Sequence, residues 1–170
     1  MIRILCLLFL AAVLIMPAAV AHPRDKARLL YKEGLALKRS GKLTAALKYF
    51  HAAIRQDDGF APAYLELGQV YALLENYRQS IYYYRKLINE DNLLSAGPED
   101  LQVIYHLGHV YYYEGNYKAA AALWSRLLDL QPQNGFAMFM LGKSYIAAGE
   151  QAKGEKLCDE SLRLEVGSKK

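Results

Sequence analysis

The sequence predicts an all-α fold, an α-solenoid of about four helix-turn-helix hairpins, and two observations favour it. The first is a repeat: similar segments recur around Gly34, Gly68, Gly108 and Gly142, at intervals of 34, 40 and 34 residues. The second is the spacing of apolar residues around each glycine, three, four and seven positions apart, which marks one buried face of a helix. Repeats of this length bury their apolar faces by stacking on their neighbours, so four of them are enough to form a core.

Each of these glycines is expected to lie where the two helices of a hairpin pack closely. A glycine inside a helix costs about 1 kcal/mol relative to alanine, so its recurrence in register needs a packing reason. Matching positions of the second helices hold small residues and, four positions later, aromatic ones: Ala46 and Phe50, Ser80 and Tyr84, Ala120 and Trp124. We expect the glycines and small residues to let the helices approach, and the aromatic rings to fill the wedge where the helices diverge.

The turns inside the hairpins repeat as well. Each holds a glycine or an asparagine after the first helix: Gly41, Asn76, Gly115 and Gly149. Helices commonly end on a residue in the left-handed conformation, which glycine and asparagine adopt at low cost. We therefore expect these four residues to be the left-handed ones that end the first helices.

The 34-residue period, with glycine, tyrosine, alanine, a large aromatic residue and Pro132 in register, resembles the tetratricopeptide repeat family. The resemblance covers residues 27–165 and implies a right-handed solenoid. Its repeats are expected at about 27–60, 61–94, 101–134 and 135–165, with an insertion at 95–100, a short lead at 22–26 and a polar tail at 166–170.

The fourth repeat departs from the family pattern in its second helix. There Gly154, Cys158 and Ser161 replace the alanine, aromatic residue and alanine of the family pattern. The helix expected over residues 150–164 is rich in charge. Because a terminal repeat must present a polar outer face to solvent, we interpret this departure as a cap.

Residues 1–21 are expected to be a secretory signal peptide. Arg3 is the only charge before His22, residues 4–16 are almost wholly apolar, and Ala19, Val20 and Ala21 offer a small-residue cleavage site. The apolar run is short for a bilayer span, which needs about 20 residues. We expect cleavage after Ala21 and a periplasmic or secreted protein; an uncleaved signal anchor, which would place the protein at the membrane, is the alternative.

The rest of the sequence points away from several classes of site. The formal net charge of +4 at pH 7 is mild and no basic stripe stands out, so we expect no nucleic-acid partner. His106 and His109 have a spacing that can bind a metal, and a cleaved chain would carry an amine beside the imidazole of His22. No third ligand is near either group in sequence, so we expect no metal and no cofactor. No catalytic motif is present, and we expect no enzyme activity.

The family resemblance implies that the first helices line a concave groove. Helical spacing selects the groove side chains that lie one turn from the buried face: Tyr31, Lys38, Gln69, Tyr105, His109, Tyr112, Phe139 and Lys143. Some members of the family bind carboxylate termini with a lysine and asparagine clamp, but here the corresponding face begins with Tyr31 and Leu35. The groove is therefore expected to be tyrosine-rich and apolar, with a few cations.

These features predict a non-enzymatic scaffold or adaptor that binds a protein or peptide segment in the tyrosine-rich groove. By resemblance to exported repeat proteins, we expect a role in envelope, pilus or secretion assembly. Self-association through exposed aromatic residues stays open. The alternative is a periplasmic protein that binds a glycan such as peptidoglycan, or a lipid, because rings of the runs at 82–84 and 111–113 can stack on sugars. Rings spaced by about 100° around a helix cannot, however, form one flat platform.

Overall fold

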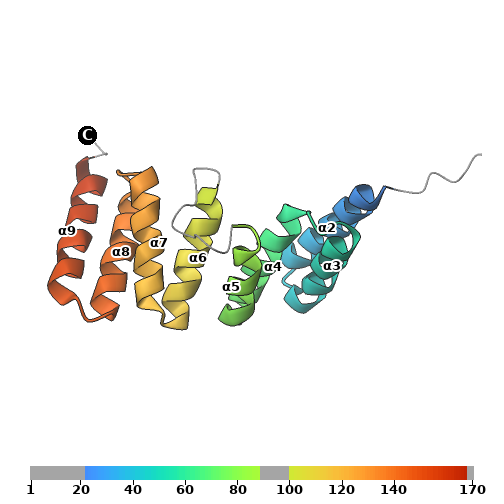
Figure 1. Ribbon diagram of the computed structural model, residues 1–170, viewed down its shortest axis with the longest axis horizontal. Coiled ribbons are helices and arrows are strands. Elements are labelled where there is room, and N and C mark those ends of the chain that lie inside the picture. The colour runs from blue at the N-terminus through green and yellow to red at the C-terminus, as the bar shows by residue number, and fades with distance from the viewer. Residues whose placement is uncertain (1–21, 89–99, 168–170) are drawn as a thin grey trace, which may run out of the picture.

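The computed structural model describes residues 22–88 and 100–167. Over these residues the chain forms eight α-helices and no strand, arranged in a row from one end of the molecule to the other (Figure 1). The helices are α2 (Pro23–Arg39), α3 (Leu43–Gln56), α4 (Ala61–Leu73), α5 (Tyr77–Arg85), α6 (Leu101–Glu114), α7 (Tyr117–Leu130), α8 (Gly135–Ala147) and α9 (Gln151–Gly167). The predicted all-α class is confirmed.

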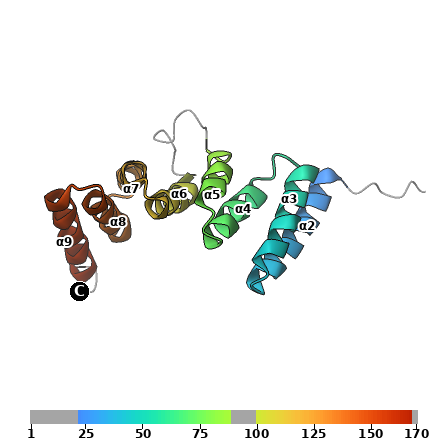
Figure 2. The same ribbon diagram turned by 90° about the horizontal axis from the view of Figure 1, so that it is seen from below.

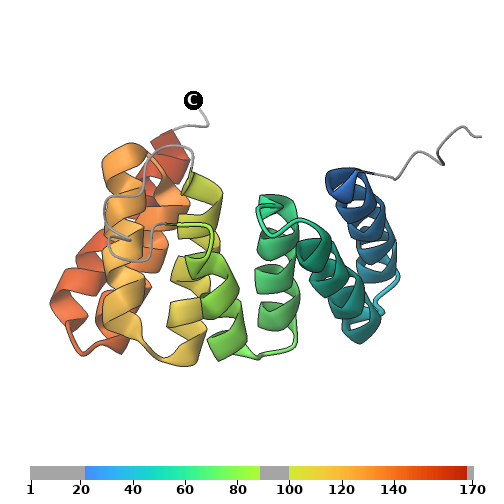
Figure 3. The same cartoon turned by 45° about the vertical axis from the view of Figure 1, so that its right-hand side comes forward.

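Consecutive helices pair as antiparallel hairpins, which we call hairpin 1 (α2 and α3), hairpin 2 (α4 and α5), hairpin 3 (α6 and α7) and hairpin 4 (α8 and α9). The hairpins follow one another in chain order when the molecule is seen from below (Figure 2) or turned toward its N-terminal end (Figure 3). Neighbouring hairpins pack through α3 against α4, α5 against α6, and α7 against α8. This serial packing is that of a solenoid, as predicted.

Several predicted boundaries differ from the helices or fall outside the described residues. Helix α2 begins at Pro23, so most of the expected lead at 22–26 is already helical, since proline fits the first turn of a helix, where its missing N–H is not needed. Helix α9 runs to Gly167, into the expected polar tail. The expected signal peptide, residues 95–99 of the insertion and residues 168–170 lie outside the described residues. None of the described helices has the length and apolar character needed to cross a membrane.

The repeated glycines lie in the core of the hairpins. In hairpin 2 the small residue Ser80 approaches Gly68 closely, as predicted, and its hydroxyl donates to the carbonyl oxygen of Gly68 at 2.7 Å. The rings of hairpins 1–3 lie closer to the glycines than predicted. There the glycine faces an aromatic ring of the second helix that is almost wholly buried. A Cβ atom placed on Gly34 would lie 2.6 Å from the Phe50 ring, and one on Gly68 would lie 2.5 Å from the Tyr84 ring. The ring of Trp124 meets Gly108 in the same way, at 2.8 Å. The rings therefore occupy the space of the missing side chains.

The left-handed residues of the turns follow the prediction in three hairpins and differ in one. Gly41, Gly115 and Gly149 have φ angles of 75°, 90° and 91°. In hairpin 2 the left-handed residue is Glu75, with φ of 58°, so the prediction of Asn76 was wrong by one position. Asn76 instead begins α5, where its side-chain oxygen accepts a hydrogen bond from the backbone N–H of Gln79 at 3.3 Å.

Candidate functional site

Side chains of the first helices contact one another from hairpin to hairpin. Lys38 of α2 reaches Glu66 and Gln69 of α4, and the amide of Gln69 reaches His106 of α6. The ring of Tyr105 of α6 in turn lies 5.5 Å from that of Phe136 of α8, between centroids. These contacts join α2, α4, α6 and α8 into one continuous surface, which we call the first-helix face.

The N-terminal part of the first-helix face is polar. The ammonium of Lys38 donates to Oε2 of Glu66 at 2.6 Å and to the side-chain oxygen of Gln69, and both Lys38 and Glu66 are mostly buried. Gln69 Nε2 lies 3.2 Å from Nε2 of His106. Burial, aided by the positive charge of Lys38 and by His109, lowers the pKa of His106, which favours its neutral form.

Tyr31, a predicted groove residue, lies at the edge of the core rather than in an open groove. Its ring centroid is 5.9 Å from that of Phe50 and 5.4 Å from that of Phe60, at the junction of hairpins 1 and 2. Burial raises the pKa of its hydroxyl, and the nearby Glu66 carboxylate adds to the effect. The residue that the sequence missed here is Glu66, although it lies one helical turn from Gln69 and so shares its face.

The C-terminal part of the first-helix face is aromatic. The rings of Tyr105 and His109 lie 4.8 Å apart, and each is 5.5 Å from Phe136. Beneath them lies Trp124, which meets His109 edge to face at 5.1 Å. Tyr105 and His109 are half-buried by this packing, whereas Phe136 keeps 42 % of its surface exposed. Helical spacing had selected Phe139 on α8 and missed Phe136, which extends the same cluster.

Tyr112 of α6 lies close to Phe139 and Lys143 of α8. All three had been predicted to line the groove, which implies that they lie near one another. The ammonium of Lys143 lies 5.4 Å from the ring centroid of Tyr112 and 5.8 Å from that of Phe139. Both distances are within the range of a cation–π contact. Phe139 is 39 % exposed and Lys143 is exposed, so this cluster of three is accessible to solvent.

A pocket of about 460 Å³ lies between α4 and α6, near the turn of hairpin 2. Its walls are formed by Gln69, Ala72, Leu73, Glu75, Tyr77, Tyr84, His106, His109, Val110 and Tyr113. Predicted groove residues supply only Gln69 and His109. The others come from the end of α4, the turn, α5 and other positions of α6, which the choice of side chains one turn from the buried face did not include.

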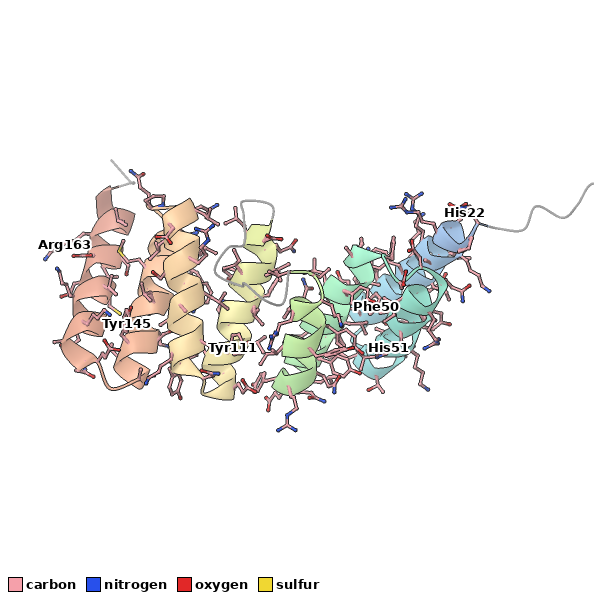
Figure 4. All side chains as sticks on the ribbon, in the orientation of Figure 1. His22, Phe50, His51, Tyr111, Tyr145 and Arg163 are labelled. Carbon is pink, nitrogen blue, oxygen red and sulfur yellow. The ribbon has the colours of Figure 1, made fainter. Side chains whose placement is uncertain are left out.

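The runs of three tyrosines extend from the core to the surface. In the run at 82–84, Tyr84 is buried and Tyr82 is exposed; in the run at 111–113, Tyr111 is buried and Tyr113 is exposed. Tyr111 is labelled in Figure 4, among the side chains of hairpin 3. As the helical geometry required, neither run forms one flat surface. Among the described residues there is also no group of three side chains placed to hold a metal ion.

Comparison with known proteins shows which family and which solved structures this chain is similar to. The family model for tetratricopeptide repeats matches residues 31–98 and 105–165. The tetratricopeptide repeat-containing protein trd-1 of Caenorhabditis elegans is 27 % identical over 124 residues, which are 72 % of this chain but only 15 % of that protein. MamA from Desulfovibrio magneticus is 22 % identical with a TM-score of 0.71, covering 82 % of this chain and 76 % of that one. BtubC from P. vanneervenii is 17 % identical with a TM-score of 0.72, covering 86 % and 66 %.

Proposed function

The chain belongs to the tetratricopeptide repeat family, and from this premise we propose that it is a non-enzymatic scaffold whose first-helix face binds a segment of another protein. The observation that carries the proposal is the cluster of exposed Phe139 and Lys143 with the half-buried Tyr112. Phe136, on the same helix as Phe139, is also exposed. Aromatic residues are enriched at the centres of protein interfaces, because they bury a large apolar area at a small entropic cost.

The bound segment is expected to be extended or helical, with apolar side chains as anchors. An amphipathic helix or an extended peptide fits a surface made of helices, since its anchors recur at the spacing of the surface side chains. A terminal carboxylate is not the expected anchor. The first-helix face begins with Tyr31 and Leu35, and Lys38, the cation predicted for the groove there, is paired with Glu66.

The test is capture of partners by a variant with the exposed cluster removed. Tyr112→Ala with Phe139→Ala should lower partner affinity at least about tenfold, because two interface aromatics are lost. Tyr105 is left intact, since it packs on Trp124 and its loss would disturb the fold. The matched control is Tyr49→Ala with Tyr82→Ala, two exposed aromatic residues of second helices. Equal capture by both folded double variants would refute the site.

We further propose that the protein is exported, with residues 1–21 removed after Ala21, and acts in the periplasm or outside the cell in envelope, pilus or secretion assembly. The support is the charge and apolar pattern of residues 1–21. Fractionation of cells that express the tagged chain, with N-terminal sequencing of the product, tests export. A product in the cytoplasm that begins at Met1 would contradict it, and one in the membrane would favour the anchor.

The alternative, binding of a glycan or a lipid, is tested with the same variants. The tyrosine runs that suggested it are divided between core and surface, so no feature of the described residues favours it over a protein partner. Pull-down with peptidoglycan and with lipid vesicles provides the comparison. Sedimentation at several protein concentrations separates self-association from binding of a different protein.

A further inference from the structure

We propose that the pocket between α4 and α6 receives an arginine side chain of the bound segment. This inference rests on the proposed function and adds the identity of one anchor. Three properties of the pocket lead to it: its aromatic walls, the charge at its mouth and the acceptors that line it.

The walls suit a flat, weakly hydrated group. The rings of Tyr77 and Tyr113 are nearly parallel, 6.3 Å apart and inclined by 19°. The ring of His109 is also nearly parallel to that of Tyr113, with centroids 6.4 Å apart and an inclination of 11°. A guanidinium stacks on aromatic faces and is more weakly hydrated than an ammonium, so such walls favour arginine over lysine. Leu73 and Val110 complete an apolar lining for its methylene groups.

The charge of the pocket is negative. Among the ten described residues that line it, Glu75 is the only one that carries a full charge at neutral pH. It forms no ion pair within the described residues, and it is exposed at the mouth. A carboxylate from a partner would be repelled there and would find no cation in the lining. Lys38, whose charge acts on His106, is outside the lining and is already paired with Glu66 at 2.6 Å.

The lining also supplies acceptors for the N–H groups of a guanidinium. Besides the carboxylate of Glu75, these are the hydroxyls of Tyr77 and Tyr113 and the unprotonated ring nitrogen of His109. The unprotonated nitrogen of His106 already accepts from the side-chain amide of Gln69, at 3.2 Å. His106 faces His109 on α6, Lys38 on α2 and the parallel ring of Tyr84 on α5, at 5.7 Å. Burial lowers the pKa of His106 and that of His109, so both rings are neutral at pH 7.

The test measures the affinity of capped pentapeptides with a central arginine, citrulline, lysine or glutamate by fluorescence anisotropy with the purified protein. Citrulline keeps the shape of arginine and lacks its charge. We expect the arginine peptide to bind about tenfold tighter than the citrulline peptide, and the glutamate peptide to bind weakest. Equal binding of arginine and citrulline, or tighter binding of glutamate, would overturn the inference.

Variants locate the effect in the pocket. Glu75→Gln should remove most of the preference for arginine, whereas Glu114→Gln, at the end of α6 but outside the lining, should leave it unchanged. If Glu75→Gln does not fold, Tyr113→Ala serves in its place, because Tyr113 is 64 % exposed. Loss of the preference in Glu114→Gln as well would assign it to general charge and contradict the pocket.

Acid provides an independent readout. Protonation of His106 and His109 adds positive charge to the lining, so affinity for the arginine peptide should fall as the pH decreases from about 7 to 5. The affinity for a peptide with a central norleucine should not fall.

The scaffold function and the arginine anchor can fail separately. If Tyr112→Ala with Phe139→Ala abolishes capture of partners and no peptide prefers the pocket, the scaffold function stands and the arginine anchor is refuted.

Discussion

Hairpins 1–3 and hairpin 4 use the same glycine position in different ways. In the first three, the glycine faces the ring of Phe50, Tyr84 or Trp124. In hairpin 4 the glycine of α8 faces both the backbone of α9 and the sulfur of Cys158, which would lie 2.7 Å from a Cβ atom on Gly142. A Cβ atom on Gly142 would lie 2.7 Å from the carbonyl oxygen of Gly154, and one on Gly154 would lie 2.5 Å from that of Gly142.

The difference changes the interpretation of the fourth repeat. Its departures from the family pattern, Gly154 and Cys158, are together the residues that let α9 lie directly on α8. Cys158 puts one sulfur atom where the other hairpins have an aromatic ring, and Gly154 leaves out a second side chain between the two backbones. The lesson is that hairpin 4 is packed by contact of backbones, whereas hairpins 1–3 are packed by large side chains.

The largest loss of stability that we expect comes from removing one of the aromatic rings that face the glycines of hairpins 1–3. Trp124 is wholly buried, so Trp124→Ala should lower the free energy of unfolding by about 4 kcal/mol, through lost burial and the cavity left behind. Urea denaturation followed by circular dichroism measures it. Leu29→Ala, at a residue that is 61 % exposed, is the control and should change stability by less than about 0.5 kcal/mol. A loss below about 1 kcal/mol for Trp124→Ala would contradict the role of the ring.

A methyl group between the backbones of hairpin 4 should have the next largest effect. Alanine is the better helix former by about 1 kcal/mol, but overpacking of this contact costs more, so Gly154→Ala should lower stability by about 2 kcal/mol. Hydrogen exchange should place the loss in α8 and α9. Gly34→Ala is the matched comparison and should cost less, because the Phe50 ring can turn about its side-chain bonds. An equal or larger loss at Gly34 would contradict the distinction.

In hairpin 4, truncation of Cys158, the residue at the position of these aromatic rings, should lower stability only slightly. Cys158 lies where the other hairpins have a large ring, but it is half-buried and contributes one sulfur atom. Cys158→Ala should therefore lower the free energy of unfolding by about 1 kcal/mol or less, measured by the same denaturation. A loss as large as that of Trp124→Ala would show that the fourth hairpin depends on this side chain after all.

The smallest effect is expected from acid, and it should be confined to hairpins 1–3. His51, which is labelled in Figure 4, has its ring against those of Tyr71 and Tyr83 at centroid distances of 6.1 and 5.6 Å. Burial lowers its pKa, as it does for His106 and His109. Below about pH 6.5 the unfolded chain binds protons that the folded chain resists, so stability should fall as the pH decreases from there toward the lower folded pKa values. Hydrogen exchange should rise in α3 and α6 and stay constant in α8 and α9. A rise first in hairpin 4, which has no histidine, would be contrary to this.

Much of the fold could be predicted because each repeat shows the same pattern of packing residues. The interval between the glycines, the aromatic residues four positions after the small ones and the glycine turns each recur, so a single ambiguous residue does not matter. Glu75 was missed because the end of a helix is set to within a residue or two by local contacts, and propensity alone favours Asn76.

The candidate site could be predicted only in part. Helical spacing identifies side chains on one face of one helix, and three of those it selected, Tyr112, Phe139 and Lys143, lie close together. It does not determine how far each hairpin is rotated against the next. That rotation decides that Phe136 rather than Phe139 meets Tyr105, that His106 meets Gln69, and that a pocket lies between α4 and α6.

The left-handed turn residue of hairpin 2 sets a limit on engineering this molecule. A residue with a side chain in that conformation is disfavoured by about 1 kcal/mol relative to glycine, which the other three turns use. Glu75→Gly is thus the substitution that a stability screen would select first. The same change would delete the carboxylate at the mouth of the pocket. Thermal robustness and recognition of a cationic anchor therefore compete for one position, and a variant selected for the first should be checked for the second.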